Sequence, residues 1–578
     1  MLRYMRSQGG WITLSMSAKL LAAAGELLIP YVLEHIIDHV APRGDGGAVL
    51  LWGLVMVLLA LAVRQANLLA NRTAVSVSSD CTRRLRQDLF VRTMSLSGAQ
   101  TDRFGLPSLI SRMTSDSYNI QNFITSIQTV GVRAPIMLVG GICVTLAMDP
   151  ALASILCVMA PVLMGVVIAV SRRGVPLYDK VQRELDGMVR VMRENITGVR
   201  VVKALSKEER ERRRFRESNE RLTRSDLKAS LVMALPGPLV QLCLNLGLVL
   251  VVLVGARRVD SGAAEPGVIL AFLTYFNLIL HSVMSFNRIF LLLSKASASA
   301  GRIAQVLEAG EDLPVLPLTE ERRRENGALL EFDHVSFTYA RTAGANPDGG
   351  ERSKCLDDVS FRLGRGETLG IIGATGAGKS TIIHLLQRFY DADEGGVYVD
   401  GRDVRTYDRG ELQKKFGTVF QNDSIFAETL TENIDLGRGL SPEAIRRAAE
   451  DAMAAGFISE KPGQYEYAAD IRGANLSGGQ KQRLLIARAL AGEPEILLLD
   501  DATSALDYRT DAAVRRALRE RRGGATAVIV AQRVSSVLSA DQILVLEEGR
   551  VIGQGRHQEL LEKCPVYREI YRVQMGEM

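Results

Sequence analysis

The chain has 578 residues, of which 47% are apolar and 23% charged, and its formal net charge at pH 7 is +5. This length exceeds one ordinary domain, and the excess positive charge lies in loops between long apolar runs, which argues against a nucleic-acid partner and for a membrane protein. None of the six cysteines forms a C-x-x-C pair, so the sequence indicates neither a zinc site nor a disulfide framework.

The first half of the chain holds six apolar segments of about 20 residues, the length that crosses a bilayer. The first segment follows Arg3 and Arg6 but runs past Pro30 without a small-residue cleavage pattern, so we interpret it as a span and not as a signal peptide. Six such runs disfavour the alternative, the buried helices of a large soluble protein. The segments are residues 11–32, 48–70, 127–148, 151–170, 231–254 and 268–293.

The charges of the connecting segments predict the orientation of these spans. Connections 71–126 and 171–230 are rich in Arg and Lys, whereas loop 41–47 has one cation and the turn Asp149-Pro150 has none. Basic connections stay in the cytoplasm, so both termini are expected there, in a multi-pass protein of the plasma (cell inner) membrane. The long connections show helical periodicity with few Gly or Pro, which predicts helices that continue into the cytoplasm.

Several polar side chains fall inside or near the apolar segments. Such groups are costly in lipid and are expected to face the bundle interior or a water-filled cavity. Two interpretations stay open, because these groups would serve equally well as substrate contacts or as interhelical hydrogen-bond partners. The residues are Glu26, Arg133, Gln241, Asn245, Asn277, His281 and Arg288.

A change of composition separates the apolar half from a soluble half. Residues 308–326 contain two prolines and a charge run, as in a linker, and residues 341–353 form a Gly/Asn/Pro-rich insert that we interpret as a flexible excursion. We therefore expect a transmembrane domain over residues 1–307, a linker over 308–326 and a soluble domain over 327–578.

The most specific motif follows the apolar strand Leu369-Gly-Ile-Ile372 and reads Gly373-Ala-Thr-Gly-Ala-Gly-Lys-Ser-Thr381. It matches the phosphate-binding loop G-x-x-x-x-G-K-[ST], whose backbone N–H groups surround the phosphates of ATP at a helix N-terminus. Lys379 is expected to reach the β- and γ-phosphates, and Ser380 to bind Mg²⁺. The predicted ATP contacts of the loop are Gly373, Thr375, Gly376, Ala377, Gly378, Lys379, Ser380 and Thr381.

Two further motifs accompany the phosphate loop. The apolar strand Ile496-Leu-Leu-Leu499 ends in Asp500, which predicts a Walker B acid beside the metal ion. Upstream of it, Leu476-Ser-Gly-Gly-Gln480 opens a predicted helix, whose N-terminus would form an anion site. With this pentapeptide the sequence resembles the ABC transporter family, and its fused six-span layout resembles the exporter type.

The resemblance implies a multi-domain fold, in which an all-α six-helix transmembrane domain with long cytoplasmic helix extensions is fused to an α/β P-loop ATP-binding cassette with a helical signature subdomain. It also implies that Ser477, Gly478 and Gly479 act in trans, on ATP held by the opposing cassette. By the same resemblance, Tyr339 stacks on adenine, and Gln421 joins Mg²⁺ to the membrane interface. Segments 103–116 and 201–219 resemble the cytoplasmic coupling loops, and residues 504–507 match the D-loop.

Two positions depart from the pattern of active family members. Asp501 stands where they carry the glutamate that deprotonates the attacking water, and Gln532 stands where they carry the switch histidine. Aspartate is one methylene shorter, and glutamine cannot become a cation. The sequence thus resembles the degenerate-site subunit of a heterodimeric multidrug exporter, whose different partner supplies the intact Glu and His.

The predicted activity is therefore ATP-driven export of amphipathic compounds, with ATP and Mg²⁺ as cofactors and no nucleic acid as partner. The chain would hydrolyse ATP poorly at its own site and would complete the site of its partner. One alternative is a homodimeric lipid or lipopeptide flippase with slow ATP turnover. Another is a regulatory membrane protein that binds ATP without pumping.

Overall fold

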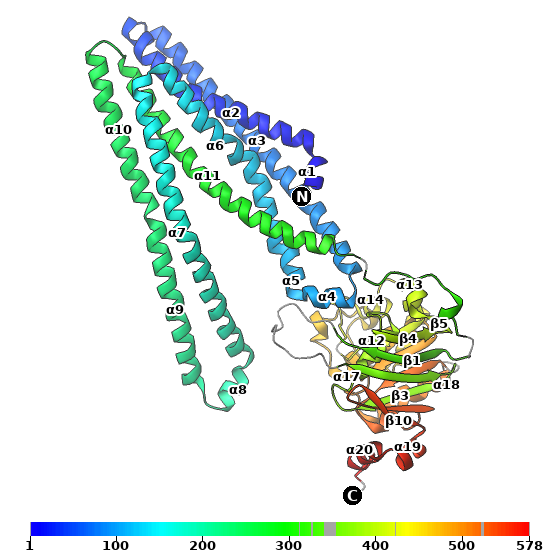
Figure 1. Ribbon diagram of the computed structural model, residues 1–578. Coiled ribbons are helices and arrows are strands. Elements are labelled where there is room, and N and C mark those ends of the chain that lie inside the picture. The colour runs from blue at the N-terminus through cyan, green and yellow to red at the C-terminus, as the bar shows by residue number, and fades with distance from the viewer. Residues whose placement is uncertain are drawn as a thin grey trace. The chain divides into compact units, whose positions relative to one another are not determined.

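The computed structural model describes residues 2–310, 312–324, 327–339, 354–421, 423–521 and 525–576 (Figure 1). The predicted insert at residues 341–353 lies outside them. The chain divides into two compact units, which we call the helical unit and the α/β unit. The helical unit comprises Met1–Met94 and Leu109–Ala309, and the α/β unit comprises Ser95–Ser108 and Gly310–Met578.

The helical unit contains six helical segments that are long and apolar enough to cross a membrane, which confirms the six predicted spans. The first begins as α2 (Gly9–His35) and continues through two short irregular turns to Arg43, and the third joins α5 (Leu106–Ser111) to α6 (Ser117–Met148) through the π-helical turn Arg112–Asp116. The other long helices are α3 (Gly46–Ser95), α7 (Pro150–Thr197), α9 (Glu208–Ala234), α10 (Pro236–Asp260) and α11 (Pro266–Leu307); the short helices of this unit are α1 (Leu2–Arg6) and α8 (Val199–Ala204).

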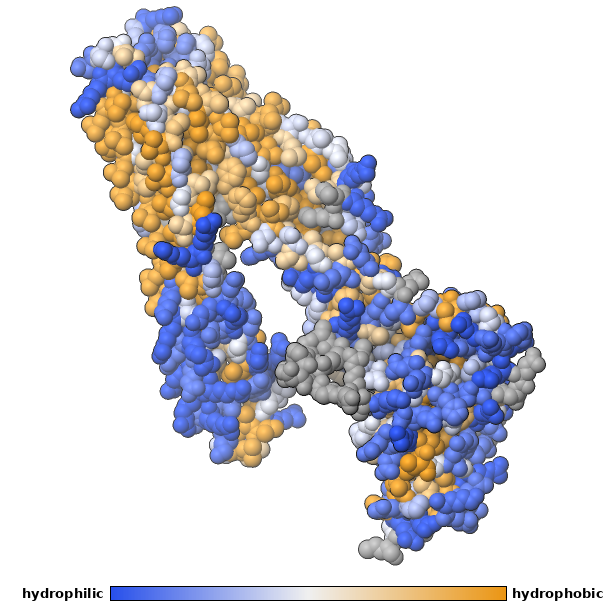
Figure 2. Space-filling model, in the orientation of Figure 1, coloured by the Kyte–Doolittle hydropathy of each residue, from blue (hydrophilic) through white to orange (hydrophobic). Residues whose placement is uncertain are grey.

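Several of these helices are longer than a bilayer is thick. The 48 residues of α7 span about 70 Å at 1.5 Å per residue, whereas the hydrocarbon core is about 30 Å thick. In the helical unit, apolar surface forms a broad band between a hydrophilic tip far from α8 and the largely hydrophilic surface around α8 and the adjoining part of α9 (Figure 2). The spans therefore continue as helices beyond the membrane, as the sequence predicted.

The turn between α6 and α7 shows how the sequence fixes a tight connection. The Asp149 carboxylate accepts hydrogen bonds from the backbone N–H groups of Ala151 and Leu152, at 2.8 and 3.1 Å, and so caps the start of α7. Its second oxygen accepts a hydrogen bond from Arg258 at 2.7 Å. A single buried carboxylate thus satisfies one helix N-terminus and ties it to α10.

Helix α11 provides the centre of the helical unit. Its Phe272, Tyr275, Phe276 and Ile279 are fully buried. The Tyr275 hydroxyl donates a hydrogen bond of 2.6 Å to the Leu27 carbonyl oxygen of α2. Because a buried phenol needs such a partner, this bond fixes α2 against α11.

The α/β unit contains two sheets. The four-stranded sheet has the order β2-β1-β4-β5 and is antiparallel, and the six-stranded sheet has the order β10-β9-β3-β8-β7-β6 and is parallel except for β10. The strands are β1 (Leu330–Phe337), β2 (Leu356–Leu363), β3 (Thr368–Gly373), β4 (Glu394–Val399), β5 (Arg402–Asp403), β6 (Phe416–Val419), β7 (Ile496–Asp500), β8 (Thr526–Val530), β9 (Gln542–Glu547) and β10 (Arg550–Gly555).

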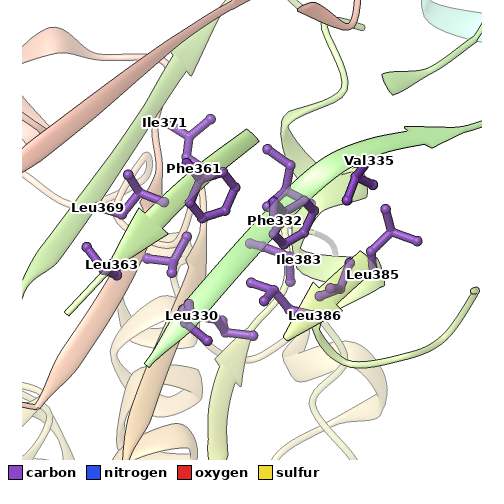
Figure 3. Close-up of a cluster of buried hydrophobic side chains, with 14 of the residues drawn as sticks. Leu330, Phe332, Val335, Phe361, Leu363, Leu369, Ile371, Ile383, Leu385 and Leu386 are labelled. Carbon is purple, nitrogen blue, oxygen red and sulfur yellow. The ribbon is translucent and has the colours of Figure 1, made fainter. Parts of the chain in front are cut away.

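The core of this unit joins both sheets to the helix that follows β3. Phe332 and Phe361 stack with ring centroids 4.6 Å apart, and Leu369 and Ile383 pack in the same cluster (Figure 3). The helices of the unit are α4 (Gly98–Phe104), α12 (Lys379–Leu386), α13 (Arg409–Lys414), α14 (Leu430–Asp435), α15 (Pro442–Asp451), α16 (Ala455–Ser459), α17 (Gly478–Ala491), α18 (Tyr508–Arg521), α19 (His557–Lys563) and α20 (Pro565–Met575).

Helix α4 belongs to the α/β unit although it lies between two spans in the sequence. Ser97 caps its N-terminus, and the Gly98 N–H donates to the Phe389 carbonyl oxygen at 3.3 Å. The Tyr390 hydroxyl donates to Asp102 at 2.6 Å. A Cβ atom at Gly98 would lie 2.8 Å from the Tyr390 ring, so only glycine permits this close approach.

A second core forms around α14, α15 and α17 and contains a buried cation. Arg488 is 7% exposed, and its guanidinium donates to the Asn433 carbonyl and side-chain oxygens at 2.7 and 2.9 Å and to the Ser424 carbonyl oxygen at 2.8 Å. These bonds connect α17 to α14 and to the segment that precedes α14.

We expect Arg488→Met to lower the free energy of unfolding of the α/β unit by about 3 kcal/mol, because it leaves buried oxygen atoms without donors. Hydrogen–deuterium exchange of the β7 amides measures this change. Arg447→Met is the matched control, since that side chain is 64% exposed and forms a surface ion pair with Glu493, and its expected effect is below about 0.5 kcal/mol. Equal effects of the two variants would contradict a structural role for Arg488.

Candidate nucleotide-binding site

A pocket of about 170 Å³ lies at the carboxyl ends of β3, β7 and β8. The carboxyl edge of a parallel sheet is where ligands bind in α/β proteins. The structure thus brings together most of the predicted site from segments far apart in the sequence. The lining residues are Cys355, Thr375, Gly376, Gly378, Lys379, Ser380, Thr381, Gln421, Asp500, Asp501, Val530 and Gln532.

The phosphate loop owes its shape to glycine. Gly376 and Gly378 have φ angles of 86° and 93°, in the left-handed region that other residues avoid. A Cβ atom at Gly378 would also lie 2.5 Å from the Cys355 carbonyl oxygen. The loop therefore wraps tightly around the N-terminus of α12, where backbone N–H groups gather.

The Lys379 side chain folds back onto the backbone of the phosphate loop. Its ammonium donates hydrogen bonds of 2.8 Å to the carbonyl oxygens of Gly373 and Ala374. Burial lowers the pKa of Lys379, while the carboxylates of Asp500 and Asp501 act in the opposite direction. The ammonium is thus held against the loop, within the electrostatic influence of the Asp500 and Asp501 carboxylates at the end of β7.

Asp500 ends β7 and is 4% exposed. Burial raises the pKa of Asp500, and a hydrogen bond from the Ser380 hydroxyl partly offsets that increase. A buried carboxylate beside a hydroxyl and the Gln421 amide forms the oxygen-rich set that Mg²⁺ prefers. The residues present therefore fit the predicted metal ion, with Ser380, Gln421 and Asp500 as the side chains that would hold it.

Asp501 and Gln532, the two departures from the family pattern, contact each other. The Gln532 amide donates to the Asp501 carboxylate at 3.1 Å. Asp501 has a φ angle of 52°, and burial followed by the charge of Asp500 raises the pKa of its carboxyl group. The Gln574 amide of α20 in turn donates to the Gln532 carbonyl oxygen at 2.9 Å, which positions the backbone of Gln532.

The structure places Tyr339 outside the residues that line the pocket. Its ring is half-buried, and its hydroxyl is 3.2 Å from the Thr381 hydroxyl and 2.9 Å from His384 Nδ1. Adenine stacking by Tyr339 stays a prediction. Two other predicted contacts, Gly373 and Ala377, lie in the loop but do not line the pocket.

Sequence reasoning missed Cys355. Its carbonyl oxygen faces Gly378, and its thiol lies 3.3 Å from the Thr381 hydroxyl. No motif marks this cysteine, because the strand that follows it, β2, reaches the loop only through the antiparallel sheet. The sequence signal that was available is weak: Cys355 directly precedes a strand-like run.

The signature segment forms a separate feature of the α/β unit. Ser477 caps α17 by accepting a hydrogen bond from the Gln480 N–H at 3.3 Å, and its own N–H donates to the Gln480 side chain at 3.1 Å. Ser477 and Gly478 are exposed. Among the residues that the structure describes, neither they nor Gly479 line the pocket at β3, so this helix N-terminus is free to meet a ligand held elsewhere.

The comparisons with known proteins bear on the whole chain. Residues 12–283 match the model of the ABC transporter transmembrane region, and residues 356–504 match the ABC transporter model. The uncharacterized ABC transporter ATP-binding protein YfiB of Bacillus subtilis is 35% identical over 96% of this chain and 94% of its own length. This chain belongs to the ABC transporter family.

Other relatives of this ABC transporter cover nearly its full length. The uncharacterized ABC transporter ATP-binding protein Rv1273c of Mycobacterium tuberculosis is 34% identical over 98% of this chain and 96% of its own. The solved structure of a bacterial Atm1-family ABC exporter with ATP bound is 25% identical, with a TM-score of 0.79 over 98% of each chain. The fold is therefore that of an exporter with an ATP-binding domain, in a multi-pass membrane protein.

We expect nucleotide affinity in the presence of Mg²⁺ to fall as the solution is acidified from neutral pH toward the raised pKa of Asp500, because burial raises that pKa and only the ionised carboxylate binds the metal well. Fluorescence titration with a trinitrophenyl analogue of ATP measures this affinity, and the same titration in EDTA gives the Mg²⁺-independent pH profile, which is subtracted. Asp500→Asn should abolish the Mg²⁺-dependent part. Identical pH profiles with and without Mg²⁺ would refute this role.

Proposed function

We propose that this chain is one subunit of a heterodimeric ABC exporter, in which it holds ATP at a degenerate site and completes the active site of a different partner subunit. Residues 1–307 form the transmembrane domain, and residues 327–578, after a linker over 308–326, form the cytoplasmic nucleotide-binding domain. The exporter moves amphipathic compounds out of the cytoplasm across the cell inner membrane.

The pairing of Asp501 with Gln532 is the observation that carries this proposal. A general base must reach the attacking water with an unpaired carboxylate oxygen. Asp501 is one methylene shorter than glutamate, and one of its oxygens already accepts the Gln532 amide at 3.1 Å. The site thus has a short acid with one of its two oxygens already hydrogen-bonded, and a neutral amide where a charge-sensing imidazole would act.

The remaining machinery of the α/β unit supports nucleotide binding. In the proposed site, Lys379 would exchange its two carbonyl partners for phosphate oxygens, and the glycines of the loop would let backbone N–H groups approach them. Mg²⁺, when bound, neutralises charge on the β- and γ-phosphates. Ser380, Gln421 and Asp500 would hold the metal ion. With Asp501 and Gln532 at the catalytic positions, hydrolysis of ATP at its γ-phosphate would be slow.

The signature segment supports a partner subunit. The capped N-terminus of α17 presents Ser477 and the N–H groups of Gly478 and Gly479 at the surface. A helix N-terminus with exposed N–H groups binds phosphate, and this one does not face the pocket of its own chain. It would therefore serve the intact site of the partner, which carries the catalytic Glu and the switch His.

Charge distribution supports the proposed orientation. The first loop and the turn at Asp149 carry little positive charge, whereas α9 and the C-terminal part of α7 are rich in Arg and Lys. Basic segments are retained in the cytoplasm. The long extensions of α7 and α9 would then transmit cassette movement to the spans and alternate the access of the membrane cavity.

The catalytic positions are tested by restoring them. The purified chain alone should hydrolyse ATP slowly, and the double substitution Asp501→Glu with Gln532→His should raise its turnover by about 100-fold, the cost of a misplacement of about 1 Å. A coupled ATPase assay in lipid nanodiscs measures the rate. The same double variant with Lys379→Ala added should stay inactive. Wild-type turnover as fast as that of the complex with its partner would overturn the degenerate site.

The signature is tested in the co-purified complex. Ser477→Arg in this chain should lower ATP turnover by about 100-fold or more, because it blocks the anion site that stabilises the charge of the partner's nucleotide. Lys379→Ala in this chain should cause a much smaller loss, since its own site contributes little hydrolysis. Equal losses from both substitutions would indicate two equivalent sites and favour a symmetric enzyme.

A further inference from the structure

A second large pocket lies within the helical unit, between α2, α3, α6 and α11, and has a volume of about 550 Å³. Lys19 and Glu26 place it inside the first apolar segment, and Arg133 places it inside the third. The pocket is therefore embedded in the part of the unit that crosses the membrane. Its lining residues are Lys19, Glu26, Asn67, Asn71, Val75, Thr125, Thr129, Val130, Arg133, Ala134, Ser282 and Ser285.

The charged side chains of this pocket are held in fixed positions. Glu26 pairs with Arg133 at 2.8 Å and also accepts a hydrogen bond from the Asn67 amide at 3.0 Å. The Lys19 ammonium donates to the side-chain oxygens of Asn67 and Asn71, at 2.7 and 3.2 Å. Lys19 is 6% exposed, so its charge is buried and points into a defined network.

The charges in this network do not balance. Lys19 and Arg133 contribute two positive charges and Glu26 one negative charge, which leaves a net charge of +1 on the lining. Within the part of the chain that the structure describes, Lys19 contacts only neutral amides and no carboxylate. A buried cation is costly unless an anion accompanies it, so the pocket is set up to accept one negative charge.

We propose that this pocket binds the transported compound through a single anionic group, a carboxylate, phosphate or sulfonate, held between Lys19 and Arg133. This inference rests on the proposed export function and names the chemical class of its substrate as an amphipathic monoanion. Val75, Val130 and Ala134 receive the apolar part, and the hydroxyl groups of α6 and α11 offer further hydrogen bonds. The same net charge disfavours lipophilic cations.

Asn67 and Asn71 act as positioning residues in this proposal. Both are on α3, four residues apart, so their side chains lie on one face of that helix. Their oxygens hold the Lys19 ammonium, and Asn67 also donates to Glu26. This leaves Lys19 with donor capacity, because an ammonium has three N–H groups and two are used.

The proposal is tested by equilibrium binding to the purified transporter in phosphatidylcholine nanodiscs without ATP, whether this chain assembles with a second copy of itself or with a different subunit. The probes are a dansylated fatty acid and its methyl ester, which differ only by the charge. Lys19→Gln should weaken binding of the acid by about 10-fold or more and leave binding of the ester unchanged, because a charge-assisted hydrogen bond is lost. Lys19→Arg should retain binding of the acid.

Matched variants separate the site from a general charge effect. Arg64→Gln removes an exposed cation of α3 that does not line the pocket, and it should not change binding of either probe. Glu26→Gln should strengthen binding of the acid, because it raises the net charge of the lining from +1 to +2. Similar affinities of the wild-type complex for the acid and the ester, or an effect of Arg64→Gln equal to that of Lys19→Gln, would overturn the proposal.

A competition arm distinguishes the source of the anion. Displacement of the dansylated acid by phosphatidylglycerol in the nanodisc, lost in Lys19→Gln, would assign the site to a lipid headgroup. If the dansylated acid still binds in nanodiscs that contain phosphatidylglycerol, the site is assigned to a free amphiphile. Either result supports the monoanion site. Because the readout needs no ATP turnover, a failed ATPase prediction would overturn the heterodimer alone, whereas a failed binding prediction would overturn this site alone.

Discussion

Two adjacent carboxyl groups at the buried end of β7 impose the constraint on which the α/β unit depends. Asp500 and Asp501 both lose hydration, and burial raises the pKa of each, so the pair is stable as two anions only beside compensating cations. Lys379 supplies one positive charge from the loop opposite. Because Lys379 alone does not balance the two carboxylates, phosphate oxygens can approach them only together with a further cation, and a divalent metal ion meets this requirement.

The pocket in the helical unit obeys the same rule with the opposite sign. Its lining carries an excess of one positive charge, whereas the lining of the nucleotide pocket, with Lys379 against Asp500 and Asp501, carries an excess of one negative charge. In both, a low dielectric makes an unbalanced charge costly, so each pocket needs a counter-charge, which is the metal ion in the nucleotide pocket and the proposed anion in the other. Fixed neutral partners, Ser380 in one pocket and Asn67 in the other, then set the geometry.

Local patterns in the sequence predicted the spans and the phosphate loop. Both structures are determined by residues close together in the sequence, namely a run of about 20 apolar residues or a glycine-rich turn before a helix. These local patterns did not predict the contacts of Tyr339 with His384, the place of Cys355, or the network of Lys19 with Asn67 and Asn71, since these join segments distant in sequence. Asn277 and His281 were expected to share a helical face, but neither is among the residues that line this pocket. The Asn277 side chain instead donates to the Leu273 carbonyl oxygen of its own helix, and His281 is exposed.

A chain of direct side-chain contacts within the α/β unit connects the phosphate loop to α4. The Tyr339 hydroxyl contacts Thr381 of α12, its ring meets the Tyr390 ring edge-on with centroids 5.1 Å apart, and the Tyr390 hydroxyl donates to Asp102 of α4. Gly98 lets α4 approach Tyr390 closely. Because such interiors are close-packed and resist compression, a displacement of Thr381 has a direct steric route to α4, the segment whose two ends continue into the second and third spans.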